Sequence, residues 1–419
     1  MNILPKTLNS ASLLLGGLIL LYGSQSVFFT LGNKGRYAAL AAGFACVLWA
    51  AFRRAGMTGI LKQSSCIIVS GLYFGCLMLL SLMQQHHIFY AQKLVFIGVC
   101  FALFIAGYVL AKTPTRDGRW TDSIVMMGGG AFLILILYRF IGYVKMISFE
   151  GTNRGFDVTE LNPVGAAYTN TVLVLLFIYM AMTVKHIWTK PLYAIVAGVA
   201  VLVVITTGSR GAPLWGVMAC TTVFGIMFVN GMVKINVKTV VTIFAFAAFG
   251  IPVAIFLFKT NYALSEKLNL LIRRFDELIY MAQGGADEAS TSARLYFWQY
   301  YLGNLETWIL AGERGYSSYP HNQWLEIMVR FGLLGIPLWF FSMFILAKSL
   351  LKAFSRKYAL SMEWYLVMLL FLFSYLQSMS SLSLEVNRTL WLGFGYLFGY
   401  QYQLKSMMGG RGYARMNSM

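Results

Sequence analysis

Long apolar stretches recur along the whole chain, with short polar connections between them. Each stretch has about 20 residues, which is enough for an α-helix to cross roughly 30 Å of hydrocarbon. The pattern therefore predicts about twelve membrane-spanning helices. We expect them near residues 11–31, 36–52, 64–83, 92–111, 122–144, 162–184, 190–207, 212–230, 236–258, 324–346, 361–379 and 387–403. No small-residue cleavage site follows the first stretch, so we interpret it as an uncleaved anchor.

Composition excludes a water-soluble globule. The chain has 419 residues, of which 58% are hydrophobic and 11% are charged, and its mean hydropathy is +0.68. A soluble protein carries about 25% charged residues, and a single apolar core stops growing at roughly 250–300 residues. We therefore predict an all-α polytopic membrane protein. The five cysteines lie in apolar stretches without metal-ligand spacing, so we expect them to be buried apolar residues.

Basic residues in the connections predict the orientation. If the N-terminus is cytoplasmic, every cytoplasmic connection carries at least two Lys or Arg residues, which is typical of the positive-inside rule. The opposite, periplasmic face carries arginines that this rule does not predict. Either they bind an anionic ligand, or they pair with local acids. These residues are Arg154, Arg210, Arg273, Arg274, Arg294, Arg314 and Arg388.

Two outer connections are long, and the larger one divides the expected domain organisation. We expect spans 1–9 in 1–258, a large periplasmic loop in 259–323, spans 10–12 in 324–403 and a cytoplasmic tail in 404–419. Apolar residues between 264 and 279 recur at helical spacing, which predicts an amphipathic helix along the membrane surface. After Gly284-Gly285, the run Ser290-Thr291-Ser292 can cap a second helix. A surface lid without chemistry is the alternative interpretation of this loop.

A turn between the seventh and eighth spans has the features of an anion site. Ser209 can cap the eighth helix, and Pro213 suits its first turn. The free N–H groups of a helix start, together with Arg210, would bind a phosphate. A glycine-rich cap with a snorkelling arginine is the alternative.

Two further signals lie in and after the large loop. Arg294 and Trp298 are four residues apart and share a helix face, either as a cation–π pair or as a site that presents a guanidinium to a phosphate. His321 lies at the mouth of the tenth span. In the first turn of a helix the dipole disfavours imidazolium, and a general base must be neutral. The alternative is a hydrogen-bonded interfacial histidine.

These motifs together resemble the O-antigen ligase and polymerase superfamily. The resemblance covers residues 150–340 in motifs, and it is carried by four matches. The family motif H-N-x9-G-x-x-G is matched by His321-Asn322 with Gly332-Leu333-Leu334-Gly335, and the motif S-R-G by Ser209-Arg210-Gly211. The motif R-L-x-x-W…G-x-G is matched by Arg294-Leu295 and Trp298 with Gly312-Glu313-Arg314-Gly315. The motif N-P-N-x-x-A is matched by Asn162-Pro163-Val164-Gly165-Ala166. In the last match Val164 replaces the second asparagine.

The resemblance implies a GT-C-like, inverting and metal-independent glycosyltransferase of the bacterial inner membrane, with its active site facing the periplasm. The donor would be an O-antigen on undecaprenyl diphosphate and the acceptor lipid A–core, with no cofactor and no nucleic acid. His321 would be the general base, and Arg210 and Arg294 would neutralise the diphosphate. The weaker candidates for donor or acceptor phosphates are Arg154, Arg273, Arg274 and Arg314, and the supporting residues are Ser209, Asn322 and Trp298.

Other functions stay open at this point. The short basic tail from Lys405 favours a lipopolysaccharide ligase over a protein O-oligosaccharyltransferase, which tends to have an added soluble region. An O-antigen polymerase is the alternative enzyme. A lipid-linked oligosaccharide transporter is the alternative from another class, but the sequence lacks the internal repeat that such proteins often show. Arg139 and Arg330 lie deeper in apolar sequence, either as functional or as snorkelling cations.

Overall fold

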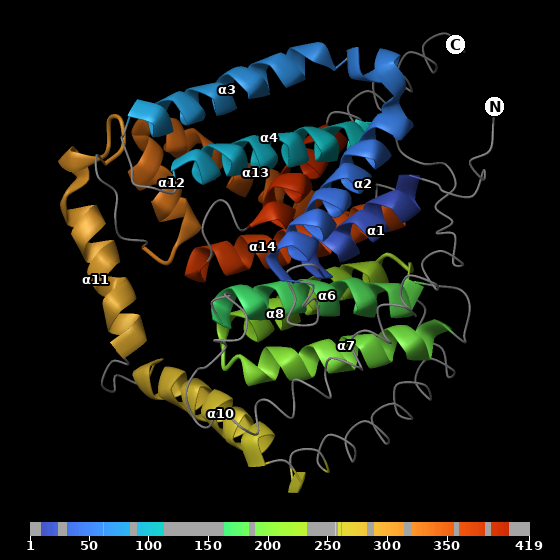
Figure 1. Ribbon diagram of the computed structural model, residues 1–419, viewed down its shortest axis with the longest axis vertical. Coiled ribbons are helices and arrows are strands. Elements are labelled where there is room, and N and C mark those ends of the chain that lie inside the picture. The colour runs from blue at the N-terminus through green and yellow to red at the C-terminus, as the bar shows by residue number, and fades with distance from the viewer. Residues whose placement is uncertain are drawn as a thin grey trace. The chain divides into compact units, whose positions relative to one another are not determined.

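The computed structural model divides into two compact units, and Figure 1 labels its helices. The first contains residues 1–17, 44–119 and 289–419, and the second contains 18–43 and 120–288. Within the parts of the chain that the structure describes, every regular element is a helix. The described residues are 10–23, 32–61, 63–83, 90–112, 163–183, 189–232, 256, 259–260, 262–282, 289–313, 320–355, 360–381 and 387–401.

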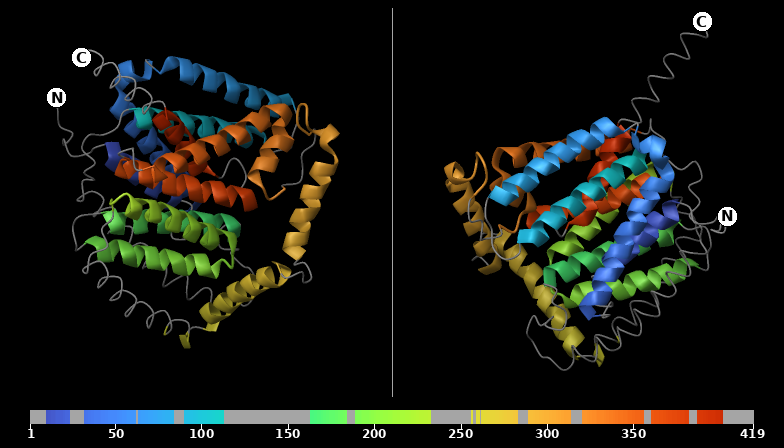
Figure 2. Two further views of the ribbon diagram at one scale, coloured as in Figure 1. Left: turned by 180° about the vertical axis from the view of Figure 1, so that it is seen from behind. Right: turned by 45° about the horizontal axis from the view of Figure 1, so that its top comes forward.

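The first unit contains most of the chain's C-terminal helices. Its elements are α3 (Ser64–Met83), α4 (Tyr90–Lys112), α11 (Ala289–Gly303), η1 (Leu305–Thr307), α12 (Gln323–Phe331), η2 (Gly332–Leu334), α13 (Gly335–Phe354), α14 (Met362–Ser380) and a helix over 388–401. The second unit contains α6 (Pro163–Thr183), α7 (Thr189–Thr206), α8 (Gly211–Val229) and α10 (Tyr262–Ala282). In it α6 packs against both α7 and α8, and α10 contacts α7 (Figure 2). α1 (Ser10–Gly23) and α2 (Gly32–Leu61) each belong to both units.

The helices confirm an all-α membrane protein. Among the described residues five segments are long and apolar enough to cross a membrane, namely Tyr37–Gly56, Ser64–Met83, Gly211–Val229, Gln323–Phe354 and Met362–Ser380. Shorter apolar helices occupy four of the other expected positions. The fifth expected span, all but one residue of the ninth, and the tail 404–419 lie outside the described residues. The total of about twelve spans and the GT-C-like fold remain predictions.

The exposure of the helices also fits a hydrocarbon surrounding. Most of α3 is uncovered by protein, and its apolar Val69 and Leu72 are each 67% exposed. Water would penalise such a surface, whereas lipid tails are as apolar as these side chains. By contrast, α14 is buried along most of its length. We therefore assign α3 to the lipid-facing side of the first unit and α14 to its core.

Polar contacts mark the two ends of the first unit. At one end Arg54 binds Glu363 in a buried ion pair of 2.7 Å. At the other end Asn322 donates to the carbonyl oxygen of Met379 over 3.0 Å. Glu363 and Met379 lie about 24 Å apart along α14. Each contact joins two residues that the expected order of spans places on the same side of the membrane.

The tenth expected span, 324–346, lies within the candidate span Gln323–Phe354, but the helix breaks inside it. α12 ends at Phe331, η2 forms one tight turn, and α13 starts at Gly335. Gly332 has φ 53, and a Cβ there would lie 2.8 Å from the backbone nitrogens of Ala311 and Gly312. Only glycine fits both the positive φ and the close approach of the neighbouring segment at residues 311–312. The break separates the short helix after His321 from the long helix α13.

Candidate functional site

The histidine motif is positioned by an asparagine cap at the start of α12. The Asn322 Oδ1 accepts hydrogen bonds from the backbone N–H groups of Trp324 and Leu325, at 3.0 and 3.1 Å. A helix start leaves such N–H groups without intrahelical partners, and an asparagine cap satisfies them. Because Asn322 also binds Met379, it fixes α12 against α14. The supporting role of Asn322 is therefore to hold the chain that carries His321.

His321 lies one residue before this cap, with φ 54. In the described part of the chain it is the only residue other than glycine with a positive φ. Histidine, asparagine and aspartate adopt this conformation more readily than other residues, but it is uncommon. Unusual backbone conformations of this kind cluster at functional sites, where the surroundings maintain them.

The surroundings lower the pKa of the His321 imidazole below its ordinary value of 6.5. Burial is the main cause, and the positive charge of Arg294 adds to it, because both disfavour imidazolium. The sequence predicts the same direction from the helix dipole if His321 lies in the first turn of the helix. This condition is not met, because His321 precedes the cap residue Asn322. Burial and Arg294 take the place of the helix dipole.

α11 brings Arg294 and Trp298 to the histidine segment. The indole Nε1 of Trp298 donates a 2.8 Å hydrogen bond to the carbonyl oxygen of Pro320, the residue before His321. Arg294 lies one turn earlier on the same helix, and its charge acts on His321. Because the two residues are four positions apart, they lie on the same face of α11 and both face the histidine segment. Trp298 holds the backbone, and Arg294 sets the charge beside the imidazole.

An apolar cluster keeps α11 against α12. Tyr301, Trp308, Leu325 and Val329 are buried together, and Trp298 packs on them. The indole of Trp308 donates to the carbonyl oxygen of Tyr301 over 2.8 Å, so the turn after α11 is fixed as well. The position of Arg294 relative to His321 therefore depends on a packed core and not on a loose surface helix.

α12 also contains a buried ion pair. Arg330 donates to Glu326 over 3.0 Å, and both side chains are almost completely buried. Arg330 also lies over the ring of Phe331, 5.3 Å from its centroid. The sequence is compatible with Arg330 as a functional or as a snorkelling cation. The structure gives it a third role, as one partner in an internal pair four residues along the same helix.

In the second unit, the predicted anion turn contacts α10. Arg210 donates to the carbonyl oxygen of Arg274 over 2.5 Å, and Arg274 donates to the carbonyl oxygen of Gly208 over 2.7 Å. Arg210 also lies 3.9 Å from Glu277. Each arginine therefore binds the backbone of the segment that carries the other, although the two residues are 64 positions apart in the sequence.

The prediction that Ser209 caps α8 is wrong. The helix starts at Gly211, Arg210 occupies the cap position, and no side chain caps it. Instead the N–H of Ser209 donates to the hydroxyl oxygen of Thr207 over 3.2 Å, and this hydroxyl donates to the carbonyl of Val204 over 2.7 Å. Thr207 therefore shapes the turn. Pro213 does lie in the first turn of α8, as predicted.

The remaining candidates are distributed as follows. Arg273 is exposed on α10 and Arg388 is buried at the start of helix 388–401. The structure therefore brings Arg274, and not its neighbour Arg273, to Arg210. The candidates outside the described residues are Arg154, Arg314, Arg139 and Asn162.

Two contacts of the histidine region were not predicted. The Asn387 amide donates to the buried Gln323 over 2.9 Å, which ties the start of α12 to the last described helix. Tyr301 also forms a side-chain hydrogen bond with Glu313, whose pKa is raised, chiefly by burial. Both contacts join residues that are distant in the sequence, so no spacing rule could identify them.

No protein-family model matches the chain, and no curated protein matches it significantly. The functional interpretation therefore depends on the chemistry of the residues and on the motif resemblance. Within the described residues no group of three His, Cys, Asp or Glu side chains could hold a metal ion. The described candidate residues thus offer cationic and imidazole groups, which suit anion binding and proton transfer.

Proposed function

We propose that the protein is an inverting, metal-independent glycosyltransferase that moves an O-antigen glycan from undecaprenyl diphosphate to a hydroxyl of lipid A–core. The observation that carries the proposal is the environment of His321. Burial and Arg294 lower the pKa of its imidazole, so the group is neutral at pH 7 and can accept a proton.

The reaction needs one displacement. His321 takes the proton from the acceptor hydroxyl as the oxygen attacks the anomeric carbon. The new glycosidic bond forms while the bond from that carbon to the diphosphate oxygen breaks, so the configuration inverts. Undecaprenyl diphosphate leaves with the electron pair, and guanidinium groups stabilise its charge. Arg294 is the first candidate in the histidine unit, and Arg210 with Arg274 is the candidate pair in the other unit.

The proposed location is the inner membrane, with the site facing the periplasm. The support is the positive-inside pattern of the connections and the arginines on the opposite side. A nucleotide-free donor fits this side of the membrane, because a lipid diphosphate carries its own leaving group. The arginines then supply the neutralisation that a divalent ion provides in other glycosyl transfers.

A reconstituted reaction tests the proposal. The purified chain in proteoliposomes is given lipid-linked O-antigen with lipid A–core, and the products are separated by gel and mass spectrometry. We expect glycan on lipid A–core, inverted at the anomeric carbon and unaffected by EDTA. Longer lipid-linked glycan formed without core acceptor would identify a polymerase instead. If neither product forms and the lipid-linked donor moves across the bilayer, the protein is a transporter.

A further inference from the structure

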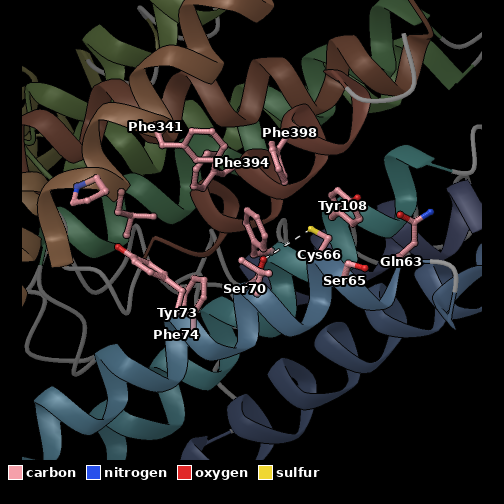
Figure 3. Close-up of a pocket in the computed structure, with 14 residues that line it drawn as sticks. Gln63, Ser65, Cys66, Ser70, Tyr73, Phe74, Tyr108, Phe341, Phe394 and Phe398 are labelled. Carbon is pink, nitrogen blue, oxygen red and sulfur yellow. Dashed lines mark hydrogen bonds between the residues drawn. The ribbon is translucent and has the colours of Figure 1, made fainter. Parts of the chain in front are cut away.

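A large apolar cavity lies in the first unit, and none of its lining residues belongs to the histidine segment 320–331. It has a volume of about 580 Å³, within the roughly 300–1,000 Å³ range of ligand sites. Its walls come from α3, α4, the start of α13 and helix 388–401 (Figure 3). Five phenylalanines line it: Phe74, Phe104, Phe341, Phe394 and Phe398. Water finds few hydrogen-bond partners in such a space, so an apolar occupant is favoured.

The length of the cavity matches one leaflet of a bilayer. Along α3 its lining runs from Gln63 to Phe74, which is about 16 Å at 1.5 Å per residue. The hydrocarbon of a membrane is roughly 30 Å thick, and α3 is one of the candidate spans. The cavity therefore reaches from the end of the span to about the middle of the membrane. That is the depth of one lipid acyl chain.

The two ends of the cavity differ in polarity. Gln63, Ser65 and Cys66 lie together at one end, next to Tyr108 (Figure 3). The ammonium group of Lys112 lies over the ring of Tyr108, 5.5 Å from its centroid. A cation therefore stands beside the polar end. At the other end Tyr73 donates to the carbonyl oxygen of Leu334, in the turn between α12 and α13.

We propose that this cavity binds an acyl chain of an anionic glycerophospholipid, with the headgroup beside Lys112 and Gln63. The apolar walls hold the chain, and the cation selects the headgroup charge. The bound chain packs against the turn after α12 through the segment that Tyr73 contacts. This proposal needs only a membrane-embedded chain, and it does not depend on the proposed transferase function.

Native mass spectrometry of the delipidated, full-length protein tests the proposal. The probes are phosphatidylglycerol, phosphatidylcholine with the same acyl chains, and undecaprenyl phosphate. Ser70→Trp places an indole in the cavity, and Leu72→Trp places the same indole on the exposed face of α3 as a control. Lys112→Gln removes the cation. Lys348→Gln is its control, because Lys348 also lies over an aromatic ring, that of Phe344, but away from the cavity.

We expect the wild type and both controls to retain one phosphatidylglycerol, roughly tenfold more tightly than phosphatidylcholine. Ser70→Trp should lose this lipid, and Lys112→Gln should lose the preference for it. Equal retention by Ser70→Trp and Leu72→Trp would overturn the site, and preferential retention of undecaprenyl phosphate would overturn the occupant. If Ser70→Trp does not fold, Cys66→Trp gives the same comparison, because Cys66 also lines the cavity and is half-buried.

Discussion

The guanidinium group of Arg210 donates a hydrogen bond to the backbone carbonyl of Arg274 over 2.5 Å. Arg274 returns the contact two residues earlier, at the carbonyl of Gly208, over 2.7 Å. Each arginine therefore fixes the backbone that carries the other. Glu277 lies 3.9 Å from the Arg210 guanidinium and balances part of its positive charge, and the proposed phosphate would bind beside the two arginines. The arrangement makes Arg274 as important to the proposed anion site as Arg210.

Replacing either arginine by lysine should therefore impair transfer. Lysine keeps the charge but loses the planar fork that binds a carbonyl and a phosphate together. We expect Arg210→Lys and Arg274→Lys to lower kcat/KM by roughly tenfold or more, since hydrogen bonds to charged groups contribute about 1.5–3 kcal/mol. Arg273→Lys on the exposed side of α10 is the matched control and should retain activity. Equal effects at Arg273 and Arg274 would contradict the proposed anion site.

Removing Arg294 should change the pH dependence of the reaction. Its positive charge lowers the pKa of His321, so Arg294→Gln should raise that pKa. A general base loses activity as the pH falls through its pKa. The acidic limb of the kcat/KM profile should therefore lie below pH 6.5 in the wild type and move to higher pH in the variant. Lys348→Gln should leave the limb in place. An unchanged acidic limb in Arg294→Gln would contradict the claim that Arg294 lowers the pKa of His321.

The Arg54–Glu363 pair should matter for stability. Both side chains are over 90% buried, and Arg54 also binds the carbonyl of Leu110. Removing one partner leaves a buried charge, which costs about 3–5 kcal/mol. We expect Arg54→Met to lower the Tm strongly in detergent, Arg54→Met with Glu363→Met to recover most of it, and exposed Arg53→Met to have little effect. A double variant as unstable as the single one would contradict this explanation.

The turn after α12 should require glycine. Gly332→Ala places a Cβ 2.8 Å from neighbouring backbone atoms, at a positive φ. Strain of this kind costs about 1–3 kcal/mol, and it should displace α12 and lower both Tm and transfer. Gly303→Ala at the end of α11 is the control, because open space surrounds that position. Similar Tm values for the two variants would show that the turn tolerates a side chain.

Local patterns predicted much of the fold. Apolar run length located the helices, and helical spacing located α10 and placed Arg294 and Trp298 on one face of α11. These features depend on residues a few positions apart, where helix geometry is fixed. The break at Gly332 was missed, because its cause is the approach of residues 311 and 312, which only the folded chain brings there.

The candidate site was predictable in its residues more than in its geometry. Asn322 is a common cap residue, yet its contact with Met379 needs α14 in place. Ser209 looked like a cap, but Thr207 already holds the turn. The meeting of Arg210 with Arg274 depends on how α10 packs beside α7, which no spacing encodes. Long-range packing therefore decided which of the neighbouring arginines, Arg273 or Arg274, reaches the turn.

The most direct test of the central claim is the transfer rate of His321→Asn in the reconstituted reaction. Asparagine tolerates the positive φ at this position, so the fold and the Tm should be preserved. Its amide cannot accept the proton, and general base catalysis contributes about 10²–10⁴-fold. We predict a loss of at least roughly a hundredfold in kcat. A correctly folded His321→Asn protein with nearly wild-type transfer would contradict the assignment of His321 as the base.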